Sequence, residues 1–330
     1  MKLRYIAATL GFACSAAALA ADTITATHVF PASLVYSRSF LEFVKKANEA
    51  GKGEFTIQVR GGPEAIGMME QPGAVRSGVV DMVYSACAFY AAVVPECDAV
   101  SASSIDGPTA RKNGGTELLN QIHQKRMGVY LLGWVDSGIR FCLWSTREPR
   151  FDSSGHIDIK GFKVRGNPIY NAFLTNYLGA QVINLNSPEL YTALERGTVE
   201  ITAWTQIGIM DLNWDRYLKY RILPDFFSTD LVILVNQKKW SSLSPKTREI
   251  LQRVGIAHES ESLHALQDLW KKEQVELQRR GIKTLSQSPE ASKRFVAGAR
   301  AASLARMKER MEKAGGTENY DRVVQLFTPE

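Results

Sequence analysis

Arginine residues at the ends of strand-like segments are the side chains of this sequence best suited to bind an anion. Arg165 ends an apolar run at residues 162–165, and a glycine-containing turn follows at residues 166–168. In open α/β sheets small molecules bind beyond the carboxyl ends of the strands, and a guanidinium matches a carboxylate with two parallel hydrogen bonds. Arg165 is therefore the first candidate for a carboxylate partner. Arg140, at another strand or lobe crossover, is the second, and a solvated surface charge is the alternative for either residue.

Aromatic side chains occur in the same segments and could enclose the apolar body of a ligand. Stacked or T-shaped rings form such a wall, while a few polar groups set the orientation of the ligand. Trp204 directly follows a strand-like segment, so we expect it to face the ligand, whereas most of the other aromatic residues are expected in the core. The full set of candidate binding residues is Arg165, Arg140, Trp204, Phe89, Tyr90, Gln71, His28 and Phe30.

The sequence shows no pattern typical of an enzyme. It contains no G-x-S-x-G elbow, no H-E-x-x-H motif, no phosphate-binding glycine loop and no dinucleotide fingerprint. The histidines are scattered, and we expect each to be a surface or capping residue, except His28 at a strand end. The sequence-based prediction is no catalytic residue, no metal and no cofactor. The alternative is an enzyme for carboxylated substrates that uses His28 or Glu70 as a base.

Cysteine spacing argues against metal ligation and against a redox pair. Beyond the N-terminal segment the chain has Cys87, Cys97 and Cys142, an odd number without C-x-x-C spacing. A disulfide between Cys87 and Cys97 and three buried thiols are both compatible with this pattern.

The first twenty residues have the pattern of a secretory signal peptide. Lys2 and Arg4 precede a short apolar stretch that ends with Ala-Leu-Ala at residues 18–20. We expect cleavage after Ala20 and a soluble mature protein, because no later run approaches the ~18 to 20 apolar residues of a membrane helix. Lipidation at Cys14 is the alternative, although the residues before it lack the expected leucine.

The net charge limits the classes of partner that the protein can bind, and the chain length predicts the number of hydrophobic cores. Loss of Lys2 and Arg4 with the signal peptide lowers the formal net charge from +6 to +4, and no long basic run remains to bind nucleic acid. A chain of 330 residues exceeds the ~250 to 300 residues at which single hydrophobic cores stop growing. We therefore expect two cores and no nucleic-acid partner.

Alternation between strand-like and helix-like periodicity predicts β-α-β units around mostly parallel sheets. In the first half, strands are expected at residues 23–28, 55–59 and 79–83, with helices ending at Gly51 and Gly78. The second half repeats this order, with strands at 162–165, 182–185 and 199–203 and helices at 170–177 and from Ser187 to Gly197. After a strand at 231–235, Ser244-Pro245 begins a helix to about residue 280, ~50 Å long if Gly255 does not kink it.

Several of these segments together resemble the substrate-binding proteins of TRAP transporters. The segments that carry the resemblance are residues 161–165 (GFKVR), 177–180 (YLGA), 188–200 (PELYTALERGTVE), 61–63 (GGP) and 78–82 (GVVDM). The resemblance extends from Thr23 to about Leu251. It implies an α/β, two-lobed periplasmic binding protein fold with hinge-crossing strands and a long helix spanning both lobes. The implied lobes are 21–138 plus about 230–268 (lobe I) and 139–229 plus about 269–330 (lobe II).

The resemblance also implies a function. A monomeric periplasmic protein would capture a small organic carboxylate and deliver it to TRAP membrane subunits, which use an ion gradient rather than ATP. In that family the arginine matching Arg165 pairs with the ligand carboxylate, and the one matching Arg140 often assists. Several members have asparagine at position 204. In others, tryptophan preceded by glutamate accompanies a metal beside a 2-oxo acid, but Ala203 stands here, so no metal is implied.

Two points remain open at the level of sequence. The ligand could be an aromatic acid, a 2-oxo or 2-hydroxy acid, or a sugar acid, because the same aromatic rings would stack on each of these. A sensor that binds a ligand and signals to a receptor, rather than supplying a transporter, is a further alternative.

Overall fold

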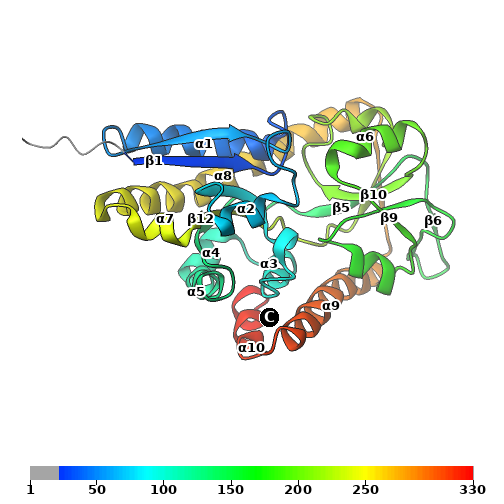
Figure 1. Cartoon of the computed structure of the whole chain (residues 1–330). Coiled ribbons are helices and arrows are strands. Elements are labelled where there is room, and N and C mark those ends of the chain that lie inside the picture. The colour runs from blue at the N-terminus through cyan, green and yellow to red at the C-terminus, as the bar shows by residue number, and fades with distance from the viewer. Residues whose placement is uncertain (1–21, 330) are drawn as a thin grey trace, which may run out of the picture.

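The computed structural model describes residues 22–329 as two α/β lobes, each built on its own β-sheet (Figure 1). The expected signal peptide lies outside the described residues. None of the described helices is both long enough and apolar enough to cross a membrane.

Lobe I contains a five-stranded mixed sheet. Its order is β2 (Phe55–Gly61), β1 (Asp22–His28), β3 (Met82–Ala86), β12 (Leu231–Asn236) and β4 (Val129–Trp134). Strand β1 is parallel to β2 and β3, whereas β12 is antiparallel to β3 and β4. The helices of this lobe are α1 (Val35–Ala50), α2 (Gln71–Ser77), η1 (Cys87–Tyr90), α3 (Cys97–Ser101), α4 (Gly107–Lys112), α5 (Gly115–Met127) and α7 (Gln237–Ser242).

Lobe II contains a six-stranded mixed sheet. Its order is β13 (Lys283–Ser286), β11 (Tyr220–Leu223), β5 (Phe141–Ser145), β10 (Ile201–Thr205), β8 (Val164–Gly166) and β9 (Val182–Asn184). Strand β5 is antiparallel to β10 and β11, and β8 is parallel to β9 and β10. The lobe also holds the hairpin β6 (Arg150–Phe151) and β7 (Ile157–Asp158), the π-helical turn η2 (Phe173–Tyr177), α6 (Ser187–Glu195) and the turn η3 (Trp214–Arg216).

Helix ends explain why two strands begin later than predicted. After α2, the N–H groups of Val79 and Val80 still bond the carbonyl of Ala74, so β3 begins at Met82 and not at residue 79. After α6, Thr198 and Val199 bond Ala193 in the same way, and β10 begins at residue 201. Both glycines that end these helices, residues 78 and 197, have a positive φ, as in a glycine-terminated helix. The first strand thus begins three residues later than the hydrophobic pattern suggests, and the second begins two residues later.

Two antiparallel segments cross between the lobes side by side. One joins β4 to β5 and the other joins β11 to β12. Arg140 and Ser228 form a β-bridge between them, and the N–H of Thr229 donates to the carbonyl of Ile139 at 3.0 Å. These are the expected hinge-crossing strands, and they lie at the base of the space between the sheets.

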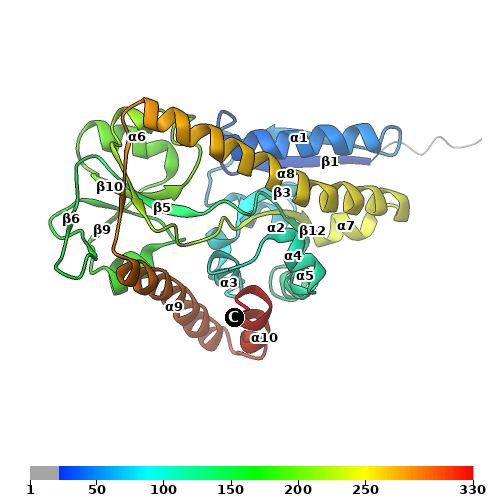
Figure 2. The same cartoon turned by 180° about the vertical axis from the view of Figure 1, so that it is seen from behind.

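Helix α8 (Pro245–Arg279) spans both lobes, as Figure 2 shows from behind. The Ser244 hydroxyl accepts a hydrogen bond from the N–H of Thr247 at 3.0 Å, which confirms the predicted helix start. The helix continues through Gly255. A Cβ at this glycine would lie 3.0 Å from Cγ of Leu132, so the glycine lets α8 approach strand β4 closely.

The C-terminal helices connect the lobes on the side opposite α8. Helix α9 (Pro289–Lys313) contacts η2 in lobe II and α3 in lobe I, and Figure 2 shows it running diagonally below the sheets. Helix α10 (Tyr320–Phe327) packs on α3 and α5 of lobe I. This placement differs from the expected assignment of residues 269–330 to lobe II. Its cause is the apolar face of α10, where Val323, Leu326 and Phe327 are buried in the core of lobe I.

A disulfide between Cys87 and Cys97 joins η1 to α3, with 5.4 Å between the two Cα atoms. The sequence left open a disulfide or three free thiols, and the structure has the disulfide. Cys142 is a buried free thiol in strand β5.

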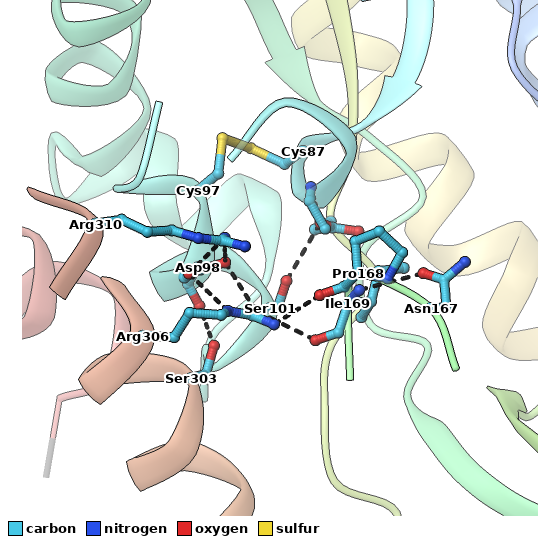
Figure 3. A network of polar contacts seen from close by, with 12 residues as sticks. Cys87, Cys97, Asp98, Ser101, Asn167, Pro168, Ile169, Ser303, Arg306 and Arg310 are labelled. Atoms are coloured by element: carbon cyan, nitrogen blue, oxygen red, sulfur yellow. Dashed lines mark hydrogen bonds and ion pairs between the residues drawn. A yellow bond between two sulfur atoms is a disulfide. The ribbon is translucent and has the colours of Figure 1, made fainter. Parts of the chain in front are cut away.

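A buried carboxylate next to this disulfide holds α9 in place (Figure 3). Asp98 is fully buried and accepts two hydrogen bonds from Arg306, at 2.9 and 2.8 Å, and further ones from Arg310. Arg306 also donates to the carbonyls of Pro168 and Ile169, at 2.6 and 3.3 Å, in the turn that follows β8. Arg306 is thus a polar bridge from lobe I, through α9, to lobe II.

We predict that Arg306→Ala loosens the turn after β8. The amides of Tyr170 and Asn171 donate to the carbonyl of Asn167 within this turn. Loss of charge-assisted hydrogen bonds should raise their hydrogen-exchange rates by about tenfold. Exchange of these two amides followed by mass spectrometry or NMR measures the effect.

Arg310→Ala is the matched control, since within residues 22–329 Arg310 also binds Asp98 but donates no hydrogen bond to a carbonyl of the turn. It should leave both exchange rates near those of the wild type. Equal acceleration in the two variants would show that the turn depends on the helix as a whole and not on Arg306.

Candidate functional site

A cavity lies between the two lobes, next to the crossing segments. Lobe I and the end of a crossing segment contribute Phe30, Tyr36, Ala86, Phe89, Thr229, Asp230 and Leu231 to its lining. Lobe II contributes Phe141, Arg165, Asn167, Ile169, Tyr170, Ser187, Trp204 and Thr205. The space open to the centre of a water-sized molecule is only about 20 Å³. That volume admits a water molecule and no organic acid, so lobes or side chains must separate before such a ligand can enter.

Arg165 is the buried cation of this cavity. It is fully buried at the middle of strand β8, where its Nε donates to the carbonyl of Leu185 at 3.0 Å and its Nη1 donates to the hydroxyl of Tyr170 at 2.6 Å. Its Nη2 is buried without any hydrogen-bond partner. No carboxylate in residues 22–329 forms an ion pair with it. Burial lowers the pKa of the guanidinium, which nevertheless keeps its charge. An unpaired buried charge of this kind needs an anion.

Aromatic rings form the walls beside Arg165. Phe30 makes T-shaped contacts with Phe89 and Trp204, with ring centroids 6.2 and 6.4 Å apart. Trp204 packs on Trp214 at 4.7 Å, and the guanidinium carbon of Arg165 lies 5.8 Å from the Trp204 ring. The indole Nε1 of Trp204 is buried without a hydrogen-bond partner. The cavity therefore combines an apolar wall with unused donors, which suits a ligand with a flat or apolar body and polar ends.

Four of the eight candidate residues line the cavity: Arg165, Trp204, Phe89 and Phe30. His28 and Gln71 lie outside the cavity lining and hold the segment after β1 that carries Phe30. The Nδ1 of His28 lies 2.7 Å from the carbonyl of Phe30, and the side-chain amide of Gln71 donates to the carbonyl of His28 at 2.9 Å. Their contribution to binding stays a prediction.

Arg140 and Tyr90 lie in other surroundings. The guanidinium of Arg140 is directed at the carbonyls of Ser103 and Phe226, at 3.5 and 3.4 Å, and the residue is not part of the cavity lining. Tyr90 is buried in lobe I, where its hydroxyl lies 3.0 Å from Nε2 of His123. Direct ligand contacts by either residue stay predictions.

Sequence reasoning missed several polar residues of the cavity. Tyr170 comes five positions after Arg165, so the short helix after the turn was a usable signal. Tyr36 and Asp230 carried no local signal. Asp230 precedes strand β12, but β12 is antiparallel to β3 and pairs Leu231 with Ala86. The amino end of β12 therefore reaches the same sheet edge as the carboxyl end of β3, which the rule of carboxyl ends does not reveal.

Asp230 is the buried acid of the cavity. Its Oδ2 accepts hydrogen bonds from the N–H of Ala88 at 2.7 Å and from the hydroxyl of Ser101 at 3.2 Å. Burial raises the pKa of its carboxyl to about 6. The cavity thus contains one cation from lobe II and one acid from the lobe I side.

The described histidines do not assemble a catalytic site. The expectation that they are surface or capping residues is wrong for His123 and His258, which are buried and whose pKa values burial lowers to about 4. Neither His28 nor Glu70, the bases considered for an enzyme, lines the cavity. Within the described part of the chain, one group has its ligand atoms spaced for a metal, namely Cys87, Cys97 and His123, but its two sulfur atoms form the disulfide.

Comparisons with known proteins agree with this architecture. The model of a family described as bacterial extracellular solute-binding protein, family 7, matches residues 26–309. An extracytoplasmic solute receptor of Bordetella pertussis that binds pyroglutamic acid superposes with a TM-score of 0.76 at 17% identity, over 93% of this chain and 99% of that chain. A TRAP periplasmic solute-binding protein of Desulfovibrio salexigens with bound orotic acid gives 0.78 at 17% identity, over 92% and 97%.

A third structure shows the range of ligands on this fold. It is a TRAP periplasmic solute-binding protein of Desulfovibrio desulfuricans with bound sn-glycerol-3-phosphate, with a TM-score of 0.76 at 16% identity, over 92% of this chain and 96% of that chain. At these identities the structural likeness shows the fold, and the family match extends over most of the chain. The chain belongs to the bacterial extracellular solute-binding proteins of family 7, the substrate-binding proteins of TRAP transporters.

Proposed function

We propose that this protein captures a small organic carboxylate between its lobes and delivers it to TRAP membrane subunits. The observation that carries the proposal is the fully buried guanidinium of Arg165, which has an unpartnered Nη2 and no carboxylate partner among the described residues. A ligand carboxylate would supply the missing counter-charge. Relatives with the same fold hold pyroglutamic acid, orotic acid and sn-glycerol-3-phosphate, which supports an anionic ligand.

The remaining parts of the proposal follow from the family and the cavity. The family is extracytoplasmic, so the N-terminal segment would direct export and be cleaved after Ala20, and the mature protein would act as a monomer in the periplasm. The narrow cavity requires the lobes to open before the ligand enters and to close around it. Stacking between Phe30 and Trp204 would then fix an aromatic acid, a 2-oxo or 2-hydroxy acid, or a sugar acid.

The decisive experiment removes the charge of Arg165. Acids that stabilise the wild type in a thermal-shift screen are titrated calorimetrically into wild type, Arg165→Lys and Arg165→Met. Loss of one partner from a buried ion pair costs ~2 to 5 kcal/mol, so Arg165→Met should weaken binding by roughly thirty-fold or more. Lysine keeps the charge but loses the planar fork, so it should restore only part of the affinity.

The stability of the same variants separates binding from folding. Since Arg165 is buried without a counter-charge, its replacement by methionine should leave the melting temperature of the ligand-free protein unchanged or raise it. Binding by Arg165→Met within about threefold of the wild type, a difference of ~0.7 kcal/mol, would place the anion elsewhere.

Trp204 tests the wall of the cavity. Trp204→Ala removes the ring that packs on Phe30 and lies beside Arg165, so it should weaken binding by about 1 to 3 kcal/mol and change the order of preference among acids. Calorimetric titration of the acid panel measures both effects. Trp214→Phe, a change to the ring behind Trp204 and outside the lining, is the control and should retain the order of preference. An unchanged order in Trp204→Ala would assign Trp204 to the core alone.

A further inference from the structure

The two carboxylate oxygens of Asp230 differ in the hydrogen bonds that they accept from other residues. Oδ2 accepts from the N–H of Ala88, at the start of η1, and from the hydroxyl of Ser101 in α3. Oδ1 receives no hydrogen bond from any other residue within 22–329, and the one further donor to this carboxylate is the N–H of Asp230 itself. Because Asp230 lines the cavity, Oδ1 is the oxygen available to a bound molecule.

No protein cation compensates this acid. The side chain of Asp230 is buried, and it forms no ion pair with any lysine, arginine or histidine of the described chain. Another acid, Asp98, adds to the unfavourable effect of burial on the ionised form of Asp230. A buried carboxylate in these surroundings is favourable only when hydrogen-bond donors reach it, and Ala88 and Ser101 supply donors to one oxygen only.

The two charged groups of the cavity lie on different lobes. Arg165 is in strand β8 of lobe II, while Asp230 is in the segment that enters β12 of lobe I. A ligand with an anion at one end and a hydrogen-bond donor at the other would satisfy Nη2 of Arg165 and Oδ1 of Asp230 together. A ligand with anions at both ends would bring its second anion to Asp230, where like charges repel.

We propose that Asp230 is a specificity-determining residue that selects acids carrying a hydrogen-bond donor, such as an ammonium, a ring N–H or a hydroxyl, and disfavours dicarboxylates. This inference rests on the proposed function, because it takes Arg165 as the partner of the ligand carboxylate. The preferred ligands are then amino acids, lactam acids and hydroxy acids of small size. The carboxylate anchors them to lobe II and the donor anchors them to lobe I, so these ligands themselves hold the lobes together.

Probes that are matched in shape and differ in their hydrogen-bond donor group test this selection in the wild type. L-Pyroglutamate is compared with 5-oxotetrahydrofuran-2-carboxylate, in which oxygen replaces the ring N–H, and L-proline is compared with cyclopentanecarboxylate. Glutarate serves as the dicarboxylate. Calorimetry at pH 8 keeps Asp230 ionised, because this pH lies above its pKa of about 6. The donor-bearing member of a pair that binds should bind roughly tenfold tighter or more, since a hydrogen bond to a charged group contributes that much.

Asp230→Asn assigns the selection to this residue. Asparagine keeps one oxygen for the N–H of Ala88 but presents an amide N–H₂ in place of the second oxygen. The preference within each pair should shrink to about threefold or less, while glutarate should bind more tightly than it does to the wild type. Ser101→Ala is the control, because it removes one support of Oδ2 and keeps the carboxylate, so the preference should persist.

The outcomes separate this inference from the proposed function. If the acids bind in a manner that depends on Arg165 but the donor-free members bind as well as their partners, or glutarate binds best, Asp230 does not select the ligand and the inference is overturned. Loss of the preference in Ser101→Ala to the same extent as in Asp230→Asn also overturns it, by assigning Asp230 to the support of η1 and α3. If neither these probes nor any acid of the thermal-shift screen binds the wild type, or binding does not depend on Arg165, the proposed function itself fails. The comparison within the wild type decides the question even where a variant does not fold.

Discussion

A positive charge buried without an ion-paired carboxylate of the protein is the constraint around which this molecule is organised. Removing a guanidinium from water is strongly unfavourable unless hydrogen bonds and an anion replace the lost solvation. The fold supplies part of that replacement, because the pairing of β8 with β9 brings the Leu185 carbonyl within 3.0 Å and the helical turn after β8 brings the Tyr170 hydroxyl within 2.6 Å. The third nitrogen of the guanidinium, Nη2, has no hydrogen-bond partner in the described part of the protein. An anion in the cavity would supply the partner that Nη2 lacks.

The division into two lobes follows the division of the cavity. One wall and the cation belong to the six-stranded sheet, while the facing wall and the acid belong to the five-stranded sheet and the segment that enters it. The crossing segments joined at Arg140 and Ser228 lie between the two sheets, so a rotation of the lobes about them would change little inside either sheet. A ligand with opposite polar ends therefore gains both of its polar contacts only in the closed arrangement. Such a ligand would bind the closed arrangement more tightly than the open one. A ligand shifts an equilibrium between two states only when its binding free energies to them differ.

The features that the sequence predicted are those that depend on near neighbours in the chain. The succession of strands and helices, the start of α8 at Ser244 and the exposure of Arg165 and Trp204 to the cavity all follow from local patterns. Residues brought in by distant pairing escaped prediction. Asp230 reaches the cavity because β12 inserts between β3 and β4, and the burial of His123 depends on how α5 packs in lobe I. Predicting such positions requires knowledge of the strand order, and hydrophobic periodicity gives no information about that order.

A continuous set of polar and covalent contacts joins the acid of the cavity to the lobe that carries its cation. Asp230 binds Ser101 of α3, and the same helix carries Asp98, whose carboxylate holds Arg306 of α9. Arg306 then holds the carbonyls of the turn at residues 168–169, directly after the strand that carries Arg165. Any motion that opens the cavity must either break these last hydrogen bonds or rotate about them. Rotation would be the less costly course, because it would keep the charge-assisted hydrogen bonds from Arg306 to these two carbonyls. The contacts of α9 with α3 and η2 would therefore act with the two crossing segments to set the axis of such a rotation.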